Sequence, residues 1–404
     1  MIIGIIGGGA SGMVAALSAA ENPNVQVILM ERQGRVGRKL MATGNGRCNL
    51  TNIHANGNSY HGQQPSFSYD ALDAFGPDKT ISWFQDMGLY TVTEETGRVY
   101  PYSDQANSVV DILRLNLVKS NITVQTDFEV NKIRVLDTGF SVFSSDECLF
   151  CDKLIIACGG LAGTKLGGTM SGYKLLGKLG HKSSRLRPAL VQLKSNWKML
   201  SGLKGVRTQC HACIFHDGTL FSQSKGELQF TDFGLSGPVI FEISRDVCSV
   251  AGDWYCKLDF LPDLTHKEIS ALIEQRMLKN LAVQDLFTGI LHNRLGRILT
   301  QCAGVNLNMP CSELTQEDIF ALVCAVKEFE VTLTEPMGMD HAQVTAGGVL
   351  TEQFDSKTME SRLIPGLYAC GEVLDIDGDC GGFNLQWAWS SGRLAGLSAG
   401  EVAG

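Results

Sequence analysis

Three glycines near the N-terminus have the spacing of a phosphate-binding turn. Gly7, Gly9 and Gly12 follow an apolar run, and Glu31 closes a second apolar run after an Ala-rich stretch. A G-x-G-x-x-G turn between a strand and a helix, with an acid about 20 residues later, is typical of a dinucleotide-binding βαβ unit. The glycines let the backbone turn and approach a pyrophosphate, and the acid accepts hydrogen bonds from ribose. This spacing predicts a dinucleotide site, against the alternative of a glycine turn in an ordinary α/β unit.

A cationic, glycine-rich loop follows this unit. Residues 32–52 carry five cations, four glycines and three asparagines in a chain whose net charge is −8. The loop leaves the second strand on the side where a dinucleotide would lie, so its cations and amides can reach a diphosphate and a flavin ring. The alternative is a solvated surface loop. Cys48 is the one cysteine of the loop, so the paired thiols of disulfide reductases are absent from it.

Two strand ends later in the chain are predicted to contact the same ligand. An apolar strand over 153–158 ends in Gly159 and Gly160, and a strand over 366–370 ends in Gly371 and Glu372. We expect Glu372 to accept a hydrogen bond from a ribitol hydroxyl. We expect the N-terminus of a helix beginning near residues 384–386 to face the flavin pyrimidine, where negative charge develops on reduction. This closing segment favours FAD over NAD.

Composition limits the class of protein. A chain of 404 residues should form two or three structural units. Its acidic balance argues against nucleic acid or an anionic membrane as the main partner. The N-terminal apolar run lacks a basic region, so we expect no signal peptide, and no stretch reaches the roughly 20 apolar residues of a membrane span. We therefore expect a cytoplasmic protein with reduced thiols, and no metal site at the C-x-x-C pairs beginning at Cys148 and Cys210.

The chain changes character twice. Residues 1–188 read as α/β, with helices over 68–90, 108–119 and 172–180 and a small antiparallel meander over 122–150. Residues 189–263 read as an inserted β-rich unit of short strands and turns. Residues 264–334 read as a small helical unit, with a capping box at Thr265 and helices over 284–303 and 316–329, the second capped by Thr315. The α/β pattern returns over 335–404.

Several motifs together resemble a bacterial family of FAD-binding oxidoreductases that includes aminoacetone oxidase and the bile-acid Δ4,6-reductase. The motifs are Gly7–Gly12 with Glu31, 37–52, 97–101, 230–238, 345–349, Gly371–Glu372 and 381–385. The resemblance spans nearly the whole chain and is most specific over 37–52. It implies a bipartite Rossmann-type FAD-binding domain, interrupted by a β-barrel and a small helical subdomain. It also implies a distant likeness to fumarate-reductase-type flavoproteins.

The FAD is expected to be bound noncovalently by residues from these motifs. The expected contacts are Gly7, Gly9, Ala10, Ser11, Gly12, Glu31, Arg32, Lys39, Leu40, Gly44, Asn45, Asn49, Val130, Gly159, Gly160, Gly371, Glu372, Gly382, Asn384, Leu385 and Gln386.

Candidates for the reaction itself are few. No second G-x-G-x-x-G follows Gly12, so we expect NAD(P)H to act as a transient electron donor, unless electrons come from a carrier or leave to oxygen. His341, Tyr100 and Arg207 are candidate catalytic residues, each weighed against a plain surface or core role. We expect a small-molecule substrate between the flavin and the insert, lined by Tyr100, 230–238 and 341–348; the alternative is that 230–238 only closes the barrel.

The leading hypothesis is an NAD(P)H-linked reductase of an activated C=C bond in a small hydrophobic or carboxylated substrate, which includes bile-acid or steroid-type enones. The runner-up is a flavin amine or aminoketone oxidase that produces hydrogen peroxide. A third hypothesis, an RNA-modifying flavoprotein, is disfavoured by the net charge of −8. The sequence does not indicate an oligomeric state.

Overall fold

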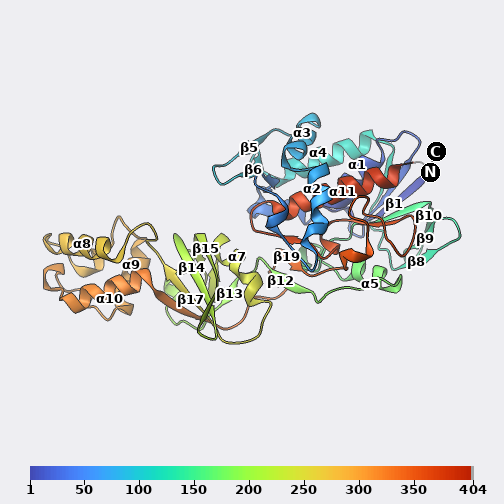
Figure 1. Ribbon diagram of the computed structural model, residues 1–404. Helices are drawn as coiled ribbons and strands as arrows, with labels where there is room; N and C mark the ends of the chain where they lie inside the picture. The colour runs from blue at the N-terminus through green and yellow to red at the C-terminus, as the bar shows by residue number, and fades with distance from the viewer. Residues whose placement is uncertain (402–404) are drawn as a thin grey trace. The chain divides into compact units, whose positions relative to one another are not determined.

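The computed structural model describes residues 1–401 and divides into two compact units (Figure 1). The first unit contains Met1–Arg187 and the chain from Gln343 onwards, and the second contains Pro188–Ala342. The chain passes out of the first unit at β12 (Arg187–Ala189) and returns at β19 (Val344–Ala346). The sequence predicts these crossings near residues 188 and 335, and the structure divides the units at Arg187–Pro188 and Ala342–Gln343.

The first unit is built on a five-stranded sheet of order β20-β11-β1-β2-β7. Its strands are β1 (Ile2–Ile6), β2 (Gln26–Met30), β7 (Ile122–Gln125), β11 (Lys153–Ile156) and β20 (Leu367–Ala369), and all neighbours pair in parallel. Near-continuous runs of Ile, Leu and Val suit such strands because a parallel sheet is covered on both faces. The meander predicted over 122–150 is wrong in its first strand, since β7 pairs in parallel with β2.

Two helices packed against each other connect the two ends of the sequence. α1 (Ala10–Ala19) and α11 (Phe383–Gly400) lie side by side in Figure 1. A Cβ atom on Gly392 of α11 would lie 2.4 Å from the carbonyl oxygen of Ser11 in α1. Only glycine permits this approach, so α11 is held directly against the helix that begins at the glycine turn.

Smaller elements surround this framework. The helices are α2 (Ser68–Ala74), α3 (Pro77–Asp86), α4 (Ala106–Lys119) and α5 (Ser171–Lys178), with 3-10 helices at Leu40–Gly46, Gly57–Ser59, Pro65–Phe67, Thr164–Leu166, Thr351–Gln353 and Gly371–Val373. Three small antiparallel sheets contain β3 (Thr51–Asn52), β5 (Thr91–Thr93) and β6 (Arg98–Pro101); β4 (Tyr60–His61) and β21 (Asp377–Gly378); and β8 (Lys132–Val135), β9 (Phe140–Phe143) and β10 (Cys148–Cys151). The single helix predicted over 68–90 is wrong, because Phe75 and Gly76 separate α2 from α3, which begins at Pro77.

The second unit contains a nearly closed antiparallel barrel. Its sheet has the order β13-β16-β15-β14-β17-β18, formed by β13 (Leu193–Lys194), β14 (Arg207–His216), β15 (Thr219–Phe230), β16 (Gly234–Ser236), β17 (Trp254–Asp259) and β18 (Phe329–Leu333). Beyond β18, the N–H of Thr334 donates to the carbonyl of Lys194, and the N–H of Lys194 donates to the carbonyl of Glu335, both at 2.9 Å. These bonds join the two edges of the sheet. The short helix α6 (Leu200–Leu203) and α7 (Pro238–Val247) accompany the barrel.

Three helices complete the second unit: α8 (His266–Met277), α9 (Asn293–Cys302) and α10 (Gln316–Lys327). The predicted caps are confirmed, since Thr265 and Thr315 both form capping boxes. The helix predicted over 284–303 is wrong. Instead, α9 is preceded by a 3-10 turn at Val283–Asp285 and by Gly289, whose φ is +82°. A further 3-10 turn lies at Cys311–Glu313.

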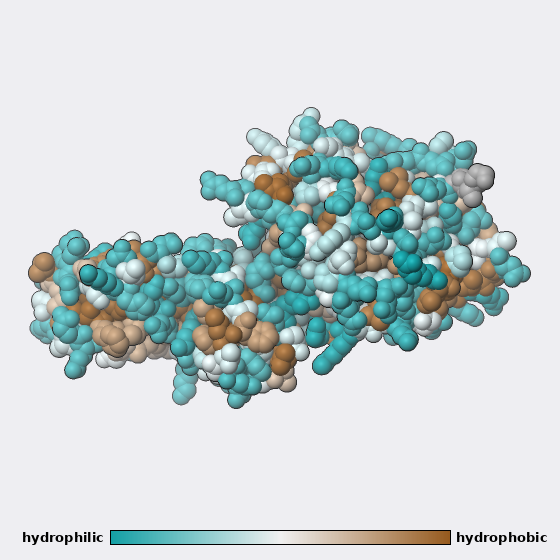
Figure 2. All heavy atoms as spheres, in the orientation of Figure 1, coloured by the Kyte–Doolittle hydropathy of each residue, from teal (hydrophilic) through white to brown (hydrophobic). Residues whose placement is uncertain are grey.

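One face of the molecule carries mainly polar residues (Figure 2). On the face shown in Figure 2, apolar residues occur in small separate groups among polar ones. Across residues 1–401, the structure contains no helix of the length and apolarity required to span a bilayer. The same residues contain no cluster of His, Cys, Asp and Glu side chains that could hold a metal ion.

Candidate cofactor-binding site

The glycine turn after β1 is held against neighbouring backbone. Gly7 has φ +110°, and a Cβ there would lie 2.4 Å from the carbonyl oxygen of Ala157. A Cβ on Gly12 would lie 1.9 Å from the carbonyl oxygen of Gly7, so the helix can approach the turn only without a side chain. Gly9 differs, because no atom lies within 4 Å of its Cβ position. The backbone is thus closed toward the protein and open at Gly9, where a pyrophosphate would approach.

Glu31 is fixed beside this turn. Its Oε2 accepts a hydrogen bond from the N–H of Gly8 at 2.8 Å, and its Oε1 accepts one from the N–H of Gln33 at 2.9 Å. The neighbouring Arg32 donates to the carbonyl of Gly167 at 3.0 Å. A carboxylate held at the end of the second strand in this way can accept hydrogen bonds from ribose hydroxyls.

The cationic loop contains a run of left-handed backbone. Gly44, Asn45 and Gly46 have φ values of +57°, +56° and +88°, and Cys48 has +60°. Leu40, at the start of this 3-10 turn, is buried. The backbone N–H groups of such consecutive turns line a concave surface, from which they can donate hydrogen bonds to anions or carbonyl oxygens. The loop therefore combines the cations predicted from sequence with a backbone shaped to donate hydrogen bonds.

Glu372 joins three of the predicted segments. Its Oε2 accepts from Nζ of Lys39 at 2.8 Å, and its Oε1 accepts from the N–H of Thr345 at 2.9 Å. A Cβ on Gly160 would lie 2.4 Å from Oε1 of Glu372. Gly159, with φ +71°, has open space at its Cβ position. The strand-end glycines, the cationic loop and the C-terminal acid therefore meet in one place, and their contacts with a cofactor stay predictions.

The N-terminus of α11 faces an unsatisfied buried acceptor. Gly382, which precedes α11, has φ +104°, and a Cβ there would lie 2.9 Å from Oδ1 of Asn49. Asn49 is 9% exposed, and this oxygen has no hydrogen-bond partner within residues 1–401. The first N–H groups of a helix also lack intrahelical partners. A donor-and-acceptor edge such as the flavin pyrimidine would satisfy both, so the residues present fit FAD.

The side chains of two predicted contact residues near α11 are bonded within the protein. Gln386 is fully buried; its Oε1 accepts from Oγ1 of Thr51 at 2.5 Å, and its Nε2 donates to the carbonyl of Phe75 at 2.9 Å. Its side chain therefore ties α11 to neighbouring elements rather than to a cofactor. Asn384 receives the N–H of Gly378 at 2.8 Å, so its side chain braces the loop before α11 and leaves its backbone N–H, like that of Leu385, for a ligand.

Other predicted contacts lie within the same framework. Ser11 is 5% exposed, and its Oγ lies 2.5 Å from the position that a Cβ on Gly371 would occupy. Ala10 begins α1 directly after Gly9. The side chain of Val130 is 5% exposed and belongs to the hydrophobic core.

Tyr100 lies in the first unit beside the cationic loop. Its side chain is buried on β6, and the guanidinium of Arg47 stacks over its ring at 4.0 Å from the centroid. Arg47 also donates to Asp104 at 2.5 Å and to Glu94 at 3.1 Å; the hydrogen bond to Asp104 is the main cause that raises the pKa of Arg47. Burial raises the pKa of Tyr100, so its hydroxyl stays protonated at neutral pH.

The other two catalytic candidates belong to the second unit. Arg207 is exposed on β14, with its guanidinium 3.4 Å from Glu227. His341 is exposed in the turn before β19 and is not part of that strand. Phe230, in the segment predicted to line the substrate, is fully buried in the core of the second unit. The catalytic roles of Arg207 and His341 stay predictions.

Sequence reasoning misses two features beside α11. His61 Nε2 lies 2.7 Å from Oδ1 of Asp379, a pair created by the β4–β21 ladder and without a local sequence signal. Arg98 lies next to Gly381, where a Cβ would be 3.0 Å from Nε of Arg98. Arg98 has a signal that could have found it, because it belongs to the 97–101 motif.

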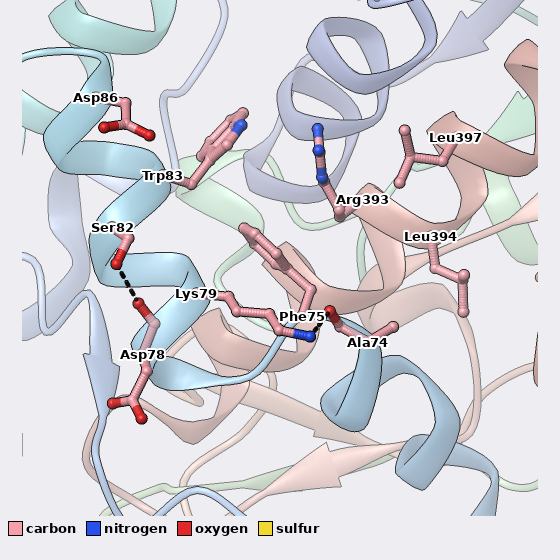
Figure 3. A pocket seen from close by; sticks show the side chains of 10 residues that line it. All are labelled: Ala74, Phe75, Asp78, Lys79, Ser82, Trp83, Asp86, Arg393, Leu394 and Leu397. Carbon is pink, nitrogen blue, oxygen red and sulfur yellow. Dashed lines mark hydrogen bonds between the residues drawn. The ribbon is translucent and has the colours of Figure 1, made fainter.

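A separate hollow of about 460 Å³ lies along the later turns of α11. Figure 3 shows Trp83 and Phe75 beside Arg393, whose guanidinium carbon lies 5.6 Å from the Phe75 ring centroid. Arg393 is ten residues beyond Phe383, or about 15 Å along the helix. None of the predicted cofactor contacts lines this hollow, so it is distinct from the candidate cofactor site.

Known relatives resemble the chain over its whole length. Residues 1–398 match the family described as HI0933-like protein Rossmann domain. The chain is 38% identical over 405 residues to the 3-dehydro-bile acid delta(4,6)-reductase of Clostridium scindens, covering 99% of each chain. It is 32% identical over 390 residues to the ribosomal RNA dihydrouridine synthase of Escherichia coli, covering 96% of this chain and 95% of that one.

Solved structures agree in fold. The 3-ketosteroid delta1-dehydrogenase of Sterolibacterium denitrificans superposes with a TM-score of 0.51 at 12% identity, covering 98% of this chain and 99% of that one. The Sdh1 complex of Mycobacterium smegmatis gives 0.50 at 14% identity, covering 98% and 67%. With the family match over 1–398 and the glycine turn, Glu31 and the α11 N-terminus in place, the chain belongs to the HI0933-like Rossmann family and is an FAD-dependent oxidoreductase.

Proposed function

We propose that this protein reduces a carbon–carbon double bond conjugated to a carbonyl group in a small substrate, using noncovalently bound FAD and electrons from NAD(P)H. The observation that carries this proposal is the 38% identity, over 99% of both chains, to a delta(4,6)-reductase. The second relative makes dihydrouridine, which is uridine with its 5,6 double bond saturated. In both products, a C=C bond next to a carbonyl has gained two hydrogens.

The first unit contains residues suited to bind the cofactor and to donate a hydrogen bond to the substrate, as such a reaction requires. Bound FAD, once reduced by NAD(P)H, would supply the hydride, and the protein would supply orientation and electrostatics. Glu31 would hold the ribose, while Lys39 and Glu372 would fix the loop and the strand end near the ribityl chain. Tyr100 offers a protonated hydroxyl that can donate a hydrogen bond to a carbonyl oxygen as charge develops on it.

NAD(P)H is proposed as a visiting donor. A second G-x-G-x-x-G turn is absent from the sequence after Gly12, so the chain carries no second dinucleotide fingerprint of the kind that disulfide reductases use. A nicotinamide that reduces the flavin and leaves would free the same face for the substrate.

Anaerobic mixing tests this proposal. Holoenzyme mixed with NADH or NADPH should lose its flavin absorbance rapidly, and a 3-oxo-4,6-diene steroid acid should restore it faster than air does. The Tyr100→Phe variant should keep FAD but reduce turnover, and the exposed Tyr90→Phe variant is the control. Peroxide formation with an amine, and no oxidation by the enone, would instead indicate an oxidase.

A ribosomal RNA uridine reductase is the second candidate, because the chain is 32% identical to such an enzyme. Against it, acidic residues outnumber basic ones in both units, whereas RNA binding draws on clustered Lys and Arg. Incubation of the reduced enzyme with ribosomal RNA that lacks dihydrouridine, followed by nucleoside mass spectrometry, decides between an RNA and a small-molecule substrate.

A further inference from the structure

We propose that Arg98 and Tyr100 form a carboxylate-binding site beside the N-terminus of α11, and that the substrate of this enzyme therefore carries a carboxylate group. The inference rests on the proposed function, because it assigns part of that substrate. It goes further by naming the anchor and the charge of the group that it holds.

Arg98 is a half-buried cation without a counter-charge. Across residues 1–401, no Asp or Glu forms an ion pair with it. Its Nε lies 3.0 Å from the position that a Cβ on Gly381 would occupy, so the guanidinium packs against the glycine loop that leads into α11. A partly desolvated guanidinium without a partner is unfavourable, and a bidentate carboxylate is the partner that its geometry fits best.

Arg47 shows the contrast. This neighbouring guanidinium is already neutralised, at 2.5 Å from Asp104 and 3.1 Å from Glu94. Its remaining contact is the face of the Tyr100 ring. Arg47 therefore positions Tyr100 and has no charge left to offer a ligand, so the anchoring role falls to Arg98.

Tyr100 points from the same side of β6 as Arg98. Residues two apart on a strand share a face, and Arg98 is close enough to act on the ionisation of Tyr100. The hydroxyl remains a donor because burial raises the pKa of Tyr100. A guanidinium and a protonated phenol on one strand face thus offer a ligand two neighbouring hydrogen-bond donors.

The N-terminus of α11 adds positive partial charge beside Arg98, although the 375–379 loop before it also carries three carboxylates. This N-terminus lies directly beyond Gly381 and Gly382. This local accumulation of donors occurs in a chain whose net charge is −8. An amine would meet Arg98 as a like charge, so the same geometry disfavours amine substrates.

Equilibrium binding to the oxidised holoenzyme tests the site without requiring turnover. The probes are two matched pairs of an acid and a neutral analogue: cinnamate with cinnamamide, and cholate with methyl cholate. The change in the flavin absorbance spectrum measures the binding of each probe. The native protein should prefer the acid of at least one pair by about tenfold or more, and Arg98→Gln should abolish this preference. Arg98→Lys should retain part of it, and Tyr100→Phe should weaken acid binding less than Arg98→Gln does.

A second arginine serves as the control for this site. Arg114→Gln removes an exposed guanidinium on α4 that pairs with Asp111, and it should leave the acid preference unchanged. An equal affinity of the native protein for acid and neutral probes would overturn the proposal. An unchanged preference for the acid in Arg98→Gln would also overturn it. If Arg98→Gln bound the acid normally but its flavin no longer added sulfite, Arg98 would be a partner of the flavin and not of the substrate. Failure of enone turnover with the acid preference intact would count against the proposed reaction alone.

Discussion

Nζ of Lys39 lies 2.8 Å from Oε2 of Glu372, although the two residues are 333 positions apart in the chain. Lys39 belongs to the cationic loop after β2, an inner strand of the parallel sheet, and Glu372 follows β20, an edge strand of that sheet. Glu372 also receives the N–H of Thr345. One carboxylate therefore connects the loop that approaches the cofactor with the segment that re-enters the first unit.

Removal of the lysine should weaken FAD binding. Lys39→Met leaves Glu372 half-buried without its cation and frees the loop, so we expect FAD affinity to fall by about tenfold. A double-mutant cycle with Glu372→Gln should give a coupling energy of about 1 kcal/mol. Isothermal titration of apoprotein with FAD measures both quantities. Lys174→Met, at an exposed position on α5, is the control, and a Lys39→Met variant with native FAD affinity would contradict the expected role.

Substitutions of two glycines in the first turn should have different effects on folding and on cofactor binding. Gly9 has φ −83° and open space at its Cβ position, so Gly9→Ala should change the free energy of unfolding of the apoprotein by less than about 0.5 kcal/mol. Its methyl group would nevertheless occupy the approach of the pyrophosphate and strongly reduce FAD binding. Gly12→Ala places a Cβ 1.9 Å from the carbonyl oxygen of Gly7 and should destabilise the apoprotein by about 3 kcal/mol.

Denaturant unfolding of the apoproteins and FAD titration together check this pair of variants. Gly177→Ala is a useful comparison because it lies within α5 and its Cβ position is open. That variant should gain about 0.5–1 kcal/mol of stability and bind FAD normally. Equal loss of stability in Gly9→Ala and Gly12→Ala would show that the turn has no specific opening toward a ligand.

Glu31 should control the adenosine end of the cofactor. The purified protein is expected to be yellow, and Glu31→Ala should weaken FAD binding by about 1–3 kcal/mol, because the ribose hydroxyls lose a partly buried acceptor. Glu31→Gln, which retains one acceptor oxygen, should lose less. The control is Glu129→Ala, an exposed carboxylate 4.0 Å from Arg32. A protein without flavin bands that takes up no added FAD would contradict the cofactor assignment.

Local sequence signals predict the βαβ unit because each part is determined by neighbouring residues. The strand, the glycine turn, the helix and the acid at Glu31 all appear where the sequence places them. The pairing partner of each strand is harder to predict from the sequence. The alternation at 122–124 indicates a strand but not that it joins β2 in parallel. Gln386 likewise acquires its role from Phe75, more than 300 residues away, which no local pattern contains.

His181 should make the stability of the protein sensitive to acid. Its imidazole is 4% exposed, stacks on Phe354 at 5.1 Å between ring centroids, and hydrogen-bonds through Nε2 to Oγ of Ser361 at 2.8 Å. Burial lowers the pKa of His181 below its ordinary value of 6.5, although a hydrogen bond with Leu176 opposes this shift. The unfolded chain therefore binds a proton at a higher pH than the folded chain does.

It follows that the contribution of His181 to the free energy of unfolding is fully present above pH 6.5 and declines as the pH falls below that value. His181→Gln can retain a hydrogen bond to Ser361 but cannot take up a proton, so its unfolding free energy should depend less on pH below 6.5 than that of the native protein. Denaturant unfolding at a series of pH values measures this difference. His54→Gln, at an exposed position, should leave the native pH dependence intact, and an identical slope in His181→Gln would remove His181 as its source.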